Sequence, residues 1–431
     1  MTGLSMPPNH PQRLELNDEA HARPPESLVA PLRLSFLALL SDPAMRERER
    51  RLVGDLALRY GVAPPAPSVN HYSADLGPFR LKWERHTEFS RYKFIVAGDG
   101  PDGFAEPAIA TVPGDWLAAL PGEVIAATHV VLEPPLDGPP DHELIAGRSF
   151  GGNALVGAVI AGGAAAAYTD FRIHADGFSR LLVQDRGMKP RQAGRMVQRL
   201  LEIDTYRILA LLALPVARDM APFLTRCERE LADTAKSLEG SSAKDEPLLL
   251  DRLTRLEAEI ESRQADTHYR FGAAAAYYEL VQRRIVDLRE DRIEGLQTFR
   301  EFTERRLAPA MNTCRAVAQR QESLSQRVAR TTQLLSTRVD LTRERQNQAV
   351  LESMNRRAKL QLRLQETVEG LSVAAVTYYV VGLVAYAIKG LKAYGADVDT
   401  DLVVGASIPV VAVLVALGVR HIRKMVTRGR V

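Results

Sequence analysis

Three aspartates stand at alternate positions in a short hydrophilic segment: Asp397, Asp399 and Asp401. Carboxylate oxygens are the ligands that hard divalent cations prefer, and this spacing is that of the first half of a calcium loop. The glycine and glutamate that complete such a loop are replaced by Leu402 and Ile408, so the segment is not an EF-hand. Several copies arranged in a ring would attract hydrated cations, whereas a single copy is simply a water-soluble turn.

The segment is positioned by two apolar runs, residues 371–388 and 402–419, each of 18 residues without a charge. A helix needs about 20 mostly apolar residues to cross the hydrocarbon core of a bilayer. Both runs end in charged residues, which argues against a hairpin buried in a soluble core. The sequence therefore predicts a transmembrane hairpin with an external loop at 389–401.

Basic residues flank the two predicted spans on one side of the membrane. Lysine and arginine near a span stay cytoplasmic, so both termini are expected in the cytoplasm. The residues that carry this prediction are Arg356, Arg357, Lys359, Arg363, Arg420, Arg423 and Lys424. The net charge is only +3, and anionic lipid headgroups are a sufficient partner for it, so nucleic acid is not expected as a ligand.

Residues 1–185 mix helical and strand patterns. Asp42, Pro43 and Gly61 are the start and stop signals of a helix over 41–61, and a short helix is expected over 113–122. Alternating or short apolar runs predict strands in FRLKWERH, FSRYKFIVAGDG, GEVIAATHVVLE, NALVGAVIAGG, AAAAYTDFRI and FSRLLVQD. We predict a cytoplasmic α+β domain with a largely meandering sheet.

Residues 186–370 have a helical pattern and form a second region. The pattern is interrupted at Pro215, Pro222, 240–247 and 308–309. From Pro309 onward neither proline nor glycine occurs before Gly370, so one helix of ~120 Å would run into the first span. Its imperfect heptad-like leucines and valines predict a stalk that packs against the preceding helices or against copies of itself. A basic cytoplasmic tail, 420–431, follows the second span.

Motifs for catalysis or cofactor binding do not occur in the sequence. The nine histidines lack zinc-ligand spacing, and Cys227 and Cys314 are expected to be buried thiols. The glycine-rich stretch 147–163 lacks the Gly-Lys-Ser/Thr ending of a phosphate loop and fits strands joined by a glycine turn. We therefore predict no enzyme activity and no cofactor other than a divalent cation such as magnesium.

Four segments spread over the chain resemble a bacterial family of uncharacterised membrane-anchored proteins. They are ELNDEAHARPPESL, DLGPFRLKWERHTEFSRYKF, RLLVQDRGMKPRQAGRMVQRLLEIDTYRILALLALP and TYYVVGLVAYAIKGLKA. The resemblance implies an anchored protein of the bacterial inner membrane and brings no activity with it.

The order of the predicted parts is similar to that of CorA-type divalent-cation transporters, which are homopentamers with a pore lined by the first span. Their Tyr-Gly-Met-Asn signature is matched here by Tyr394 and Gly395, while Ala396 and Asp397 depart from it. The resemblance implies a pore mouth at Tyr394, Gly395, Asp397, Asp399 and Asp401. It implies a pore lining at Ser372, Thr377, Tyr378 and Tyr379.

Two functions remain open from the sequence. One is a homo-oligomeric CorA-like cation transporter or channel, a pentamer if the likeness holds. Against it, Lys389 and Lys392 would bring ammonium groups near the mouth. The other is a scaffold without transport activity, in which the hairpin only anchors a cytoplasmic interaction domain.

Overall fold

The computed structural model describes residues 7–14, 16–17, 24–67, 69–98, 103–134, 141–393 and 399–428. The chain divides into two compact units. The first comprises Met1–Gly240 and Asp251–Thr331, and the second Ser241–Leu250 and Thr332–Val431. The predicted order of a mixed α+β part followed by long helices, some of them apolar, is confirmed.

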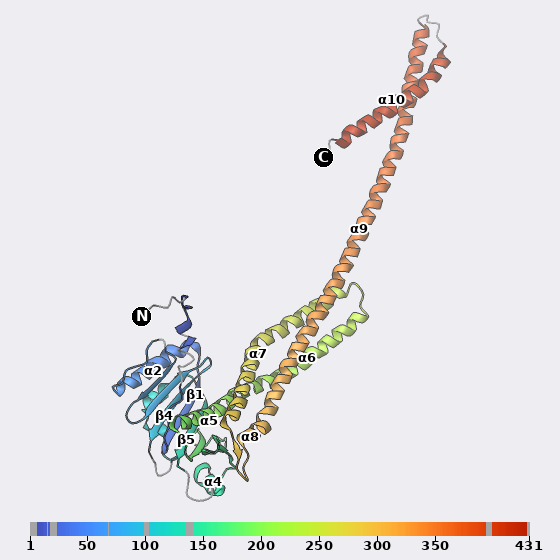
Figure 1. Cartoon of the computed structure of the whole chain (residues 1–431). Helices are drawn as coiled ribbons and strands as arrows, with labels where there is room; N and C mark the ends of the chain where they lie inside the picture. Colours follow the sequence, from blue (N-terminus) through green and yellow to red (C-terminus); the bar gives the residue numbers. More distant parts are fainter. Residues whose placement is uncertain are drawn as a thin grey trace. The chain divides into compact units, whose positions relative to one another are not determined.

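The first unit is built on a nine-stranded sheet with the order β2-β3-β4-β1-β5-β8-β7-β6-β9 (Figure 1). Its strands are β1 (Leu32–Leu40), β2 (His71–Asp75), β3 (Arg80–Arg85), β4 (Phe89–Ala97), β5 (Glu123–Glu133), β6 (Val156–Ile160), β7 (Ala165–Thr169), β8 (Ser179–Asp185) and β9 (Asp291–Arg292). The two halves, β2-β3-β4 and β8-β7-β6, are antiparallel meanders; the strand patterns predict all of these strands except β2. They are joined through β1, which pairs with β4 and β5, and through the parallel pairing of β5 with β8.

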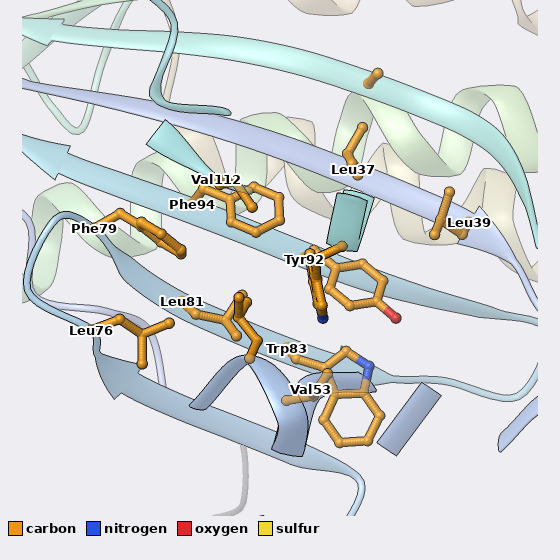
Figure 2. Close-up of a cluster of buried hydrophobic side chains, with 13 residues drawn as sticks. Leu37, Leu39, Val53, Leu76, Phe79, Leu81, Trp83, Tyr92, Phe94 and Val112 are labelled. Atoms are coloured by element: carbon orange, nitrogen blue, oxygen red, sulfur yellow. The ribbon is translucent and has the colours of Figure 1, made fainter. Parts of the chain in front are cut away.

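One face of the sheet is covered by α2 (Arg46–Arg59) and α3 (Gly114–Ala119) over an apolar core. Figure 2 shows Leu81, Trp83, Tyr92 and Phe94 of β3 and β4 turned toward Val53 of α2. Helix α2 begins where the sequence predicts, because the Asp42 carboxylate accepts a hydrogen bond from the Ala44 amide, 2.7 Å away, at the start of the preceding turn. It ends before Gly61, whose φ of 71° is in the left-handed region.

The other face carries α5 (Pro190–Leu211), which packs on β5. It is followed by α6 (Ala213–Glu239), α7 (Glu246–Leu288), α8 (Phe299–Arg306) and α9 (Ala308–Ala393), while α4 (His142–Phe150) precedes β6. Charged pairs join α6 to its neighbours: Arg320 of α9 bonds Glu228 at 2.6 and 2.7 Å, and Arg226 bonds Glu259 of α7. These contacts hold α6, α7 and the first part of α9 together as a bundle.

The second unit contains the start of α7, the remainder of α9, and α10 (Thr400–Arg428). Glu246 near the beginning of α7 pairs with Arg338 of α9 at 2.6 Å, and Leu335 and Val339 are buried. Beyond them, residues 343–368 are exposed along the whole helix.

Some element boundaries differ from the sequence predictions. The helical pattern of 191–238 breaks at Leu212, so Pro215 falls in the first turn of α6, where its missing N–H is tolerated. The predicted interruption at Pro222 is wrong as a break, because Pro222 lies inside α6. The pattern of 248–307 is two helices: Arg289 and Gly295 have positive φ around β9, and a capping box of Thr298 and Glu301 starts α8.

Candidate functional site

Three helical segments in the described part of the chain are long and apolar enough to cross a membrane: Pro190–Glu239, which joins α5 and α6, Phe299–Leu391, which joins α8 and α9, and Asp401–Ile422 of α10. The sequence predicts only the last two. The most apolar stretch is 33% buried in the first helix, 11% in the second and 0% in the third. The first therefore stands apart, because part of its apolar surface is already covered by protein.

Two acids lie in the first half of that segment, on α5. Glu202 and Asp204 are buried there against the sheet. The hydroxyls of Thr128 and Ser179 donate to the Asp204 carboxylate at 2.8 and 2.9 Å. Two carboxylates with partners on the sheet domain are typical of a helix packed on protein, since charged side chains facing lipid are costly.

The polar side chains predicted to line a pore lie on the first apolar run of α9. Ser372 donates to the carbonyl of Val368 at 2.9 Å, and Thr377 donates to that of Val373 at 2.7 Å. Tyr378 and Tyr379 are 78% and 71% exposed, and their rings meet edge to face at 5.8 Å. The hydroxyl groups of Ser372 and Thr377 are thus hydrogen-bonded within their own helix.

A groove of about 680 Å³ lies between the last part of α9 and α10. Thr377 and Gly382 line it from α9, and Val404 and Ile408 line it from α10. Every lining residue is aliphatic, glycine, threonine or tyrosine, so this groove offers no charged ligand to an ion.

The predicted pore mouth is described only in part. Tyr394, Gly395 and Asp397 lie outside the described residues. The Asp399 carboxylate accepts from the backbone amides of Asp401 and Leu402 at 3.2 and 3.4 Å, so it caps α10.

The predicted orienting residues are basic side chains on the flanks of the hairpin. Arg356, Arg357, Lys359 and Arg363 are exposed on α9, and Arg420 is exposed on α10. The side chains of Arg423 and Lys424 lie outside the described part. Among the described residues, no group of three His, Cys, Asp or Glu side chains is placed to hold a metal ion.

The sequence reasoning missed a buried ionic network on the α5 face of the sheet. Glu84 of β3 is fully buried and is surrounded by three cations. Arg91 Nε lies 2.5 Å from it, Lys82 Nζ 3.4 Å and Lys93 Nζ 3.8 Å. Arg91 also bonds Glu202 of α5 at 3.2 Å, which ties the sheet to the helix.

The network perturbs its own ionisable groups. Burial alone would raise the pKa of Glu84, but Arg91, Lys93 and Lys82 together lower that pKa to about 2. Burial, reinforced by the neighbouring Arg91, lowers the pKa of Lys93 to about 7. Lys93 therefore changes charge near neutral pH inside the protein.

The strand pattern does not predict this network. In β3 and β4 the charged residues alternate with aromatic ones, which is typical of a strand with one solvated face. Helix α5 covers that face instead. The available signal was in α5 itself, where Glu202 and Asp204 interrupt the run LLEIDTY.

Ser35, His129 and Asp176 have the residue types of a hydrolase triad. Ser35 Oγ lies 2.9 Å from His129 Nδ1, and His129 Nε2 lies 3.9 Å from Asp176. Ser35 is fully buried and accepts a hydrogen bond from the Ile109 amide, while His129 stacks on Phe178 at 3.8 Å. Burial lowers the pKa of His129 to about 4. The arrangement is a buried hydrogen-bonded link between β1 and β5, out of a substrate's reach.

One known protein family matches nearly the whole chain. A family model described as "Protein of unknown function (DUF3422)" matches residues 8–426. The chain belongs to this family. Neither a curated protein nor a solved structure matches it.

The match to the DUF3422 family covers every element from β1 to the greater part of α10. The ionic network and the apolar hairpin thus both fall inside the region that the family model describes. The family description carries no activity, so the function of this DUF3422 protein has to be argued from its side chains.

Proposed function

We propose that this DUF3422 protein is an integral protein of the bacterial inner membrane, in which residues 371–388 and 402–419 form a two-span hairpin with both termini in the cytoplasm. The observation that carries the proposal is the exposure of large apolar side chains over both helices of the hairpin. Leu371 is 75% exposed, Leu402 70% and Leu414 63%. Lipid would cover this surface, and the basic flanks set the orientation.

In our proposal the protein is an anchored scaffold without enzymatic activity, and nucleic acid is not among its partners. The hairpin holds the sheet domain at the membrane, where that domain binds a partner. Support comes from the two span hydroxyls, which bond their own helix, and from the groove without charges. A hairpin of this kind serves as an anchor without any polar path.

A hairpin exchange tests the scaffold. Residues 371–419 are replaced by an unrelated two-span hairpin of equal length and orientation, and a deletion strain with a measurable phenotype receives either version. The scaffold predicts full complementation by the exchanged protein. Loss of complementation with normal abundance and membrane targeting would contradict it.

A second candidate is CorA-like transport of a divalent cation by a homo-oligomer, pentameric in that family. One observation favours it: α9 is a single helix from bundle residues such as Arg320 into the first span, the arrangement expected for a gate coupled to a pore. The exposed apolar residues of 343–368 are available for packing between copies.

Flux measurement distinguishes the two candidates. Purified protein is reconstituted into liposomes that contain a magnesium-sensitive dye. Transport predicts magnesium entry above that of empty liposomes and a decrease when Asp397 is replaced by alanine. Flux equal to that of empty liposomes, from protein with verified insertion, would exclude the transporter.

A further inference from the structure

A polar pocket of about 440 Å³ lies at the end of the β3-β4 hairpin, inside the first unit. Arg46 of α2 and Arg85 of β3 line it together with Asn70, and Tyr206 of α5 and Tyr277 of α7 contribute aromatic rings. Four elements distant in sequence thus meet around one opening. Neither the ionic network around Glu84 nor the hairpin includes any of these five residues.

The charge of Arg85 is oriented but not neutralised. Its guanidinium donates to the Arg46 carbonyl at 3.3 Å and to the Asn70 side-chain oxygen, both neutral acceptors. Within the described residues neither Arg46 nor Arg85 has a carboxylate within 4.0 Å. Burial and the adjacent Arg46 lower the pKa of Arg85, which is the response of a cation that lacks a counter-ion.

Two acids, Glu88 and Glu49, lie near the pocket. Glu88 accepts from Arg270 at 2.9 Å and from the Tyr277 hydroxyl at 2.7 Å. Glu49, whose charge acts favourably on Arg85, is fully buried; one carboxylate oxygen accepts from Ser90 at 2.6 Å, and the other has no hydrogen-bond partner among the described residues. Since Glu88 is paired with Arg270, the two guanidinium groups of Arg46 and Arg85 outnumber the single carboxylate of Glu49, and the pocket keeps an excess of positive charge.

Part of the pocket wall is aromatic. Tyr206 and Tyr277 are stacked at 5.6 Å with an angle of 20° between their planes, and Phe89 meets Tyr206 edge to face at 6.3 Å. The Tyr277 hydroxyl is fixed by Glu88. Such a wall suits a flat or apolar group, while paired guanidinium groups suit the doubly charged oxygens of a phosphate ester.

We propose that this pocket binds a small phosphate monoester that carries a planar group, with the phosphate held by Arg46 and Arg85 and the planar group against the tyrosine pair. Pockets for small ligands have volumes of this order. The site is independent of the proposed anchoring function, because none of its residues belongs to the hairpin.

Calorimetric titration of the detergent-solubilised full chain tests the proposal. The probes are adenosine 5′-monophosphate, adenosine, glycerol 3-phosphate as a headgroup-like ester, and inorganic phosphate, all at constant ionic strength. The variants are Arg46→Gln and Arg85→Gln. Arg51→Gln is the matched control, since its side chain is exposed on the same helix and does not line the pocket.

The proposal expects the nucleotide to bind more tightly than any other probe. Each pocket variant should weaken nucleotide binding by about tenfold or more, as expected for loss of a charge-assisted hydrogen bond, while Arg51→Gln leaves it unchanged. If Arg85→Gln fails to fold, Arg46→Gln alone tests the site. Arg46 is exposed, so its replacement is not expected to disturb folding.

Three results would overturn it. Absence of nucleotide binding at millimolar concentration would show that the pocket is not a nucleotide-binding site. Equal weakening by Arg46→Gln and Arg51→Gln shows only diffuse attraction. Equal affinity for the nucleotide and adenosine would show that the phosphate is not recognised. Equal affinity for the nucleotide and glycerol 3-phosphate would show that the planar group is not recognised.

Discussion

At the scale of single residues, Glu84 is the acid that three buried cations share. Without it, Lys82, Arg91 and Lys93 would repel one another in a medium that water does not reach. Two of these cations have a second carboxylate, Glu26 for Lys82 and Glu202 for Arg91. Glu84 therefore joins several ion pairs into one network between sheet and helix.

Replacing Glu84 by glutamine is expected to destabilise the protein by about 3–5 kcal/mol, because breaking a buried ion pair leaves uncompensated charge. The change should appear as a large drop of the thermal midpoint. Glu47→Gln is the control: it removes an exposed pair with Arg50, and little change of the thermal midpoint is expected because water screens that pair. Similar midpoints for both variants would show that the network contributes little.

Lys93 makes stability depend on pH in a defined direction. Its folded pKa of about 7 is below the ordinary lysine value of about 10.4, so between these values the unfolded chain binds the proton and the folded chain does not. The unfolding free energy consequently rises with pH across this window. Lys93→Met should abolish that rise. The unfolding free energy of the variant minus that of the wild type should therefore decrease from pH 6 to pH 9. Parallel pH profiles of thermal midpoint for the two proteins would contradict this.

At the scale of elements, the exposed part of α9 has two unlike faces. Charged residues at spacings of seven, four, three and four share one face: Arg345, Glu352, Arg356, Lys359 and Arg363. Large apolar residues lie around the rest of the helix, interspersed with Arg343, Glu344 and Arg357; they are Val350, Leu351, Met354, Leu360, Leu362, Leu364 and Val368. Exposure of this many large apolar side chains is typical of a helix that packs against another helix.

For the proposed homo-oligomer, we expect the double variant Val350→Glu with Leu364→Glu to lower the mass of the detergent-solubilised protein, because it would place charge in the contact between copies. The pair Arg345→Glu with Gln348→Glu is the control on the polar face. Light scattering corrected for detergent measures both. An unchanged mass in the first variant would remove 343–368 from the assembly interface.

Sequence patterns predicted elements whose signals are local. Helix α2 has its cap, proline and terminal glycine within one segment, and strands β3 to β8 have clear runs of their own. Strand β1 was not predicted because it is buried on both faces and shows no alternation, and β9 because it has only two residues. Strand β2 was not predicted either, because its sequence HYSAD has no run of large apolar residues. The network and the pocket escaped for another reason: their residues come from strands and helices far apart in the chain.

At the scale of the whole molecule, three helical segments are long and apolar enough to serve as a membrane anchor. We expect a chain that ends at Glu366 to be released from membranes by alkaline carbonate, while the full chain remains. The reason is that the apolar face of α5 is already packed on β5, with Leu200, Leu201 and Leu209 buried. Retention of the shortened chain would mean that the segment Pro190–Glu239 enters the bilayer.

The parallel pairing of β5 with β8 has a consequence for how the protein is made. The first meander can form as it leaves the ribosome, but β5 obtains its second neighbour only when β8 has been synthesised, and β6 obtains β9 only after α5, α6 and α7. The apolar hairpin is translated later still. Since domains generally fold from the N-terminal side during synthesis, we expect the sheet to be complete before the apolar hairpin is translated. In the proposed membrane protein, insertion would therefore act on a chain whose sheet domain is already folded, and mutations that delay the sheet should also delay delivery to the membrane.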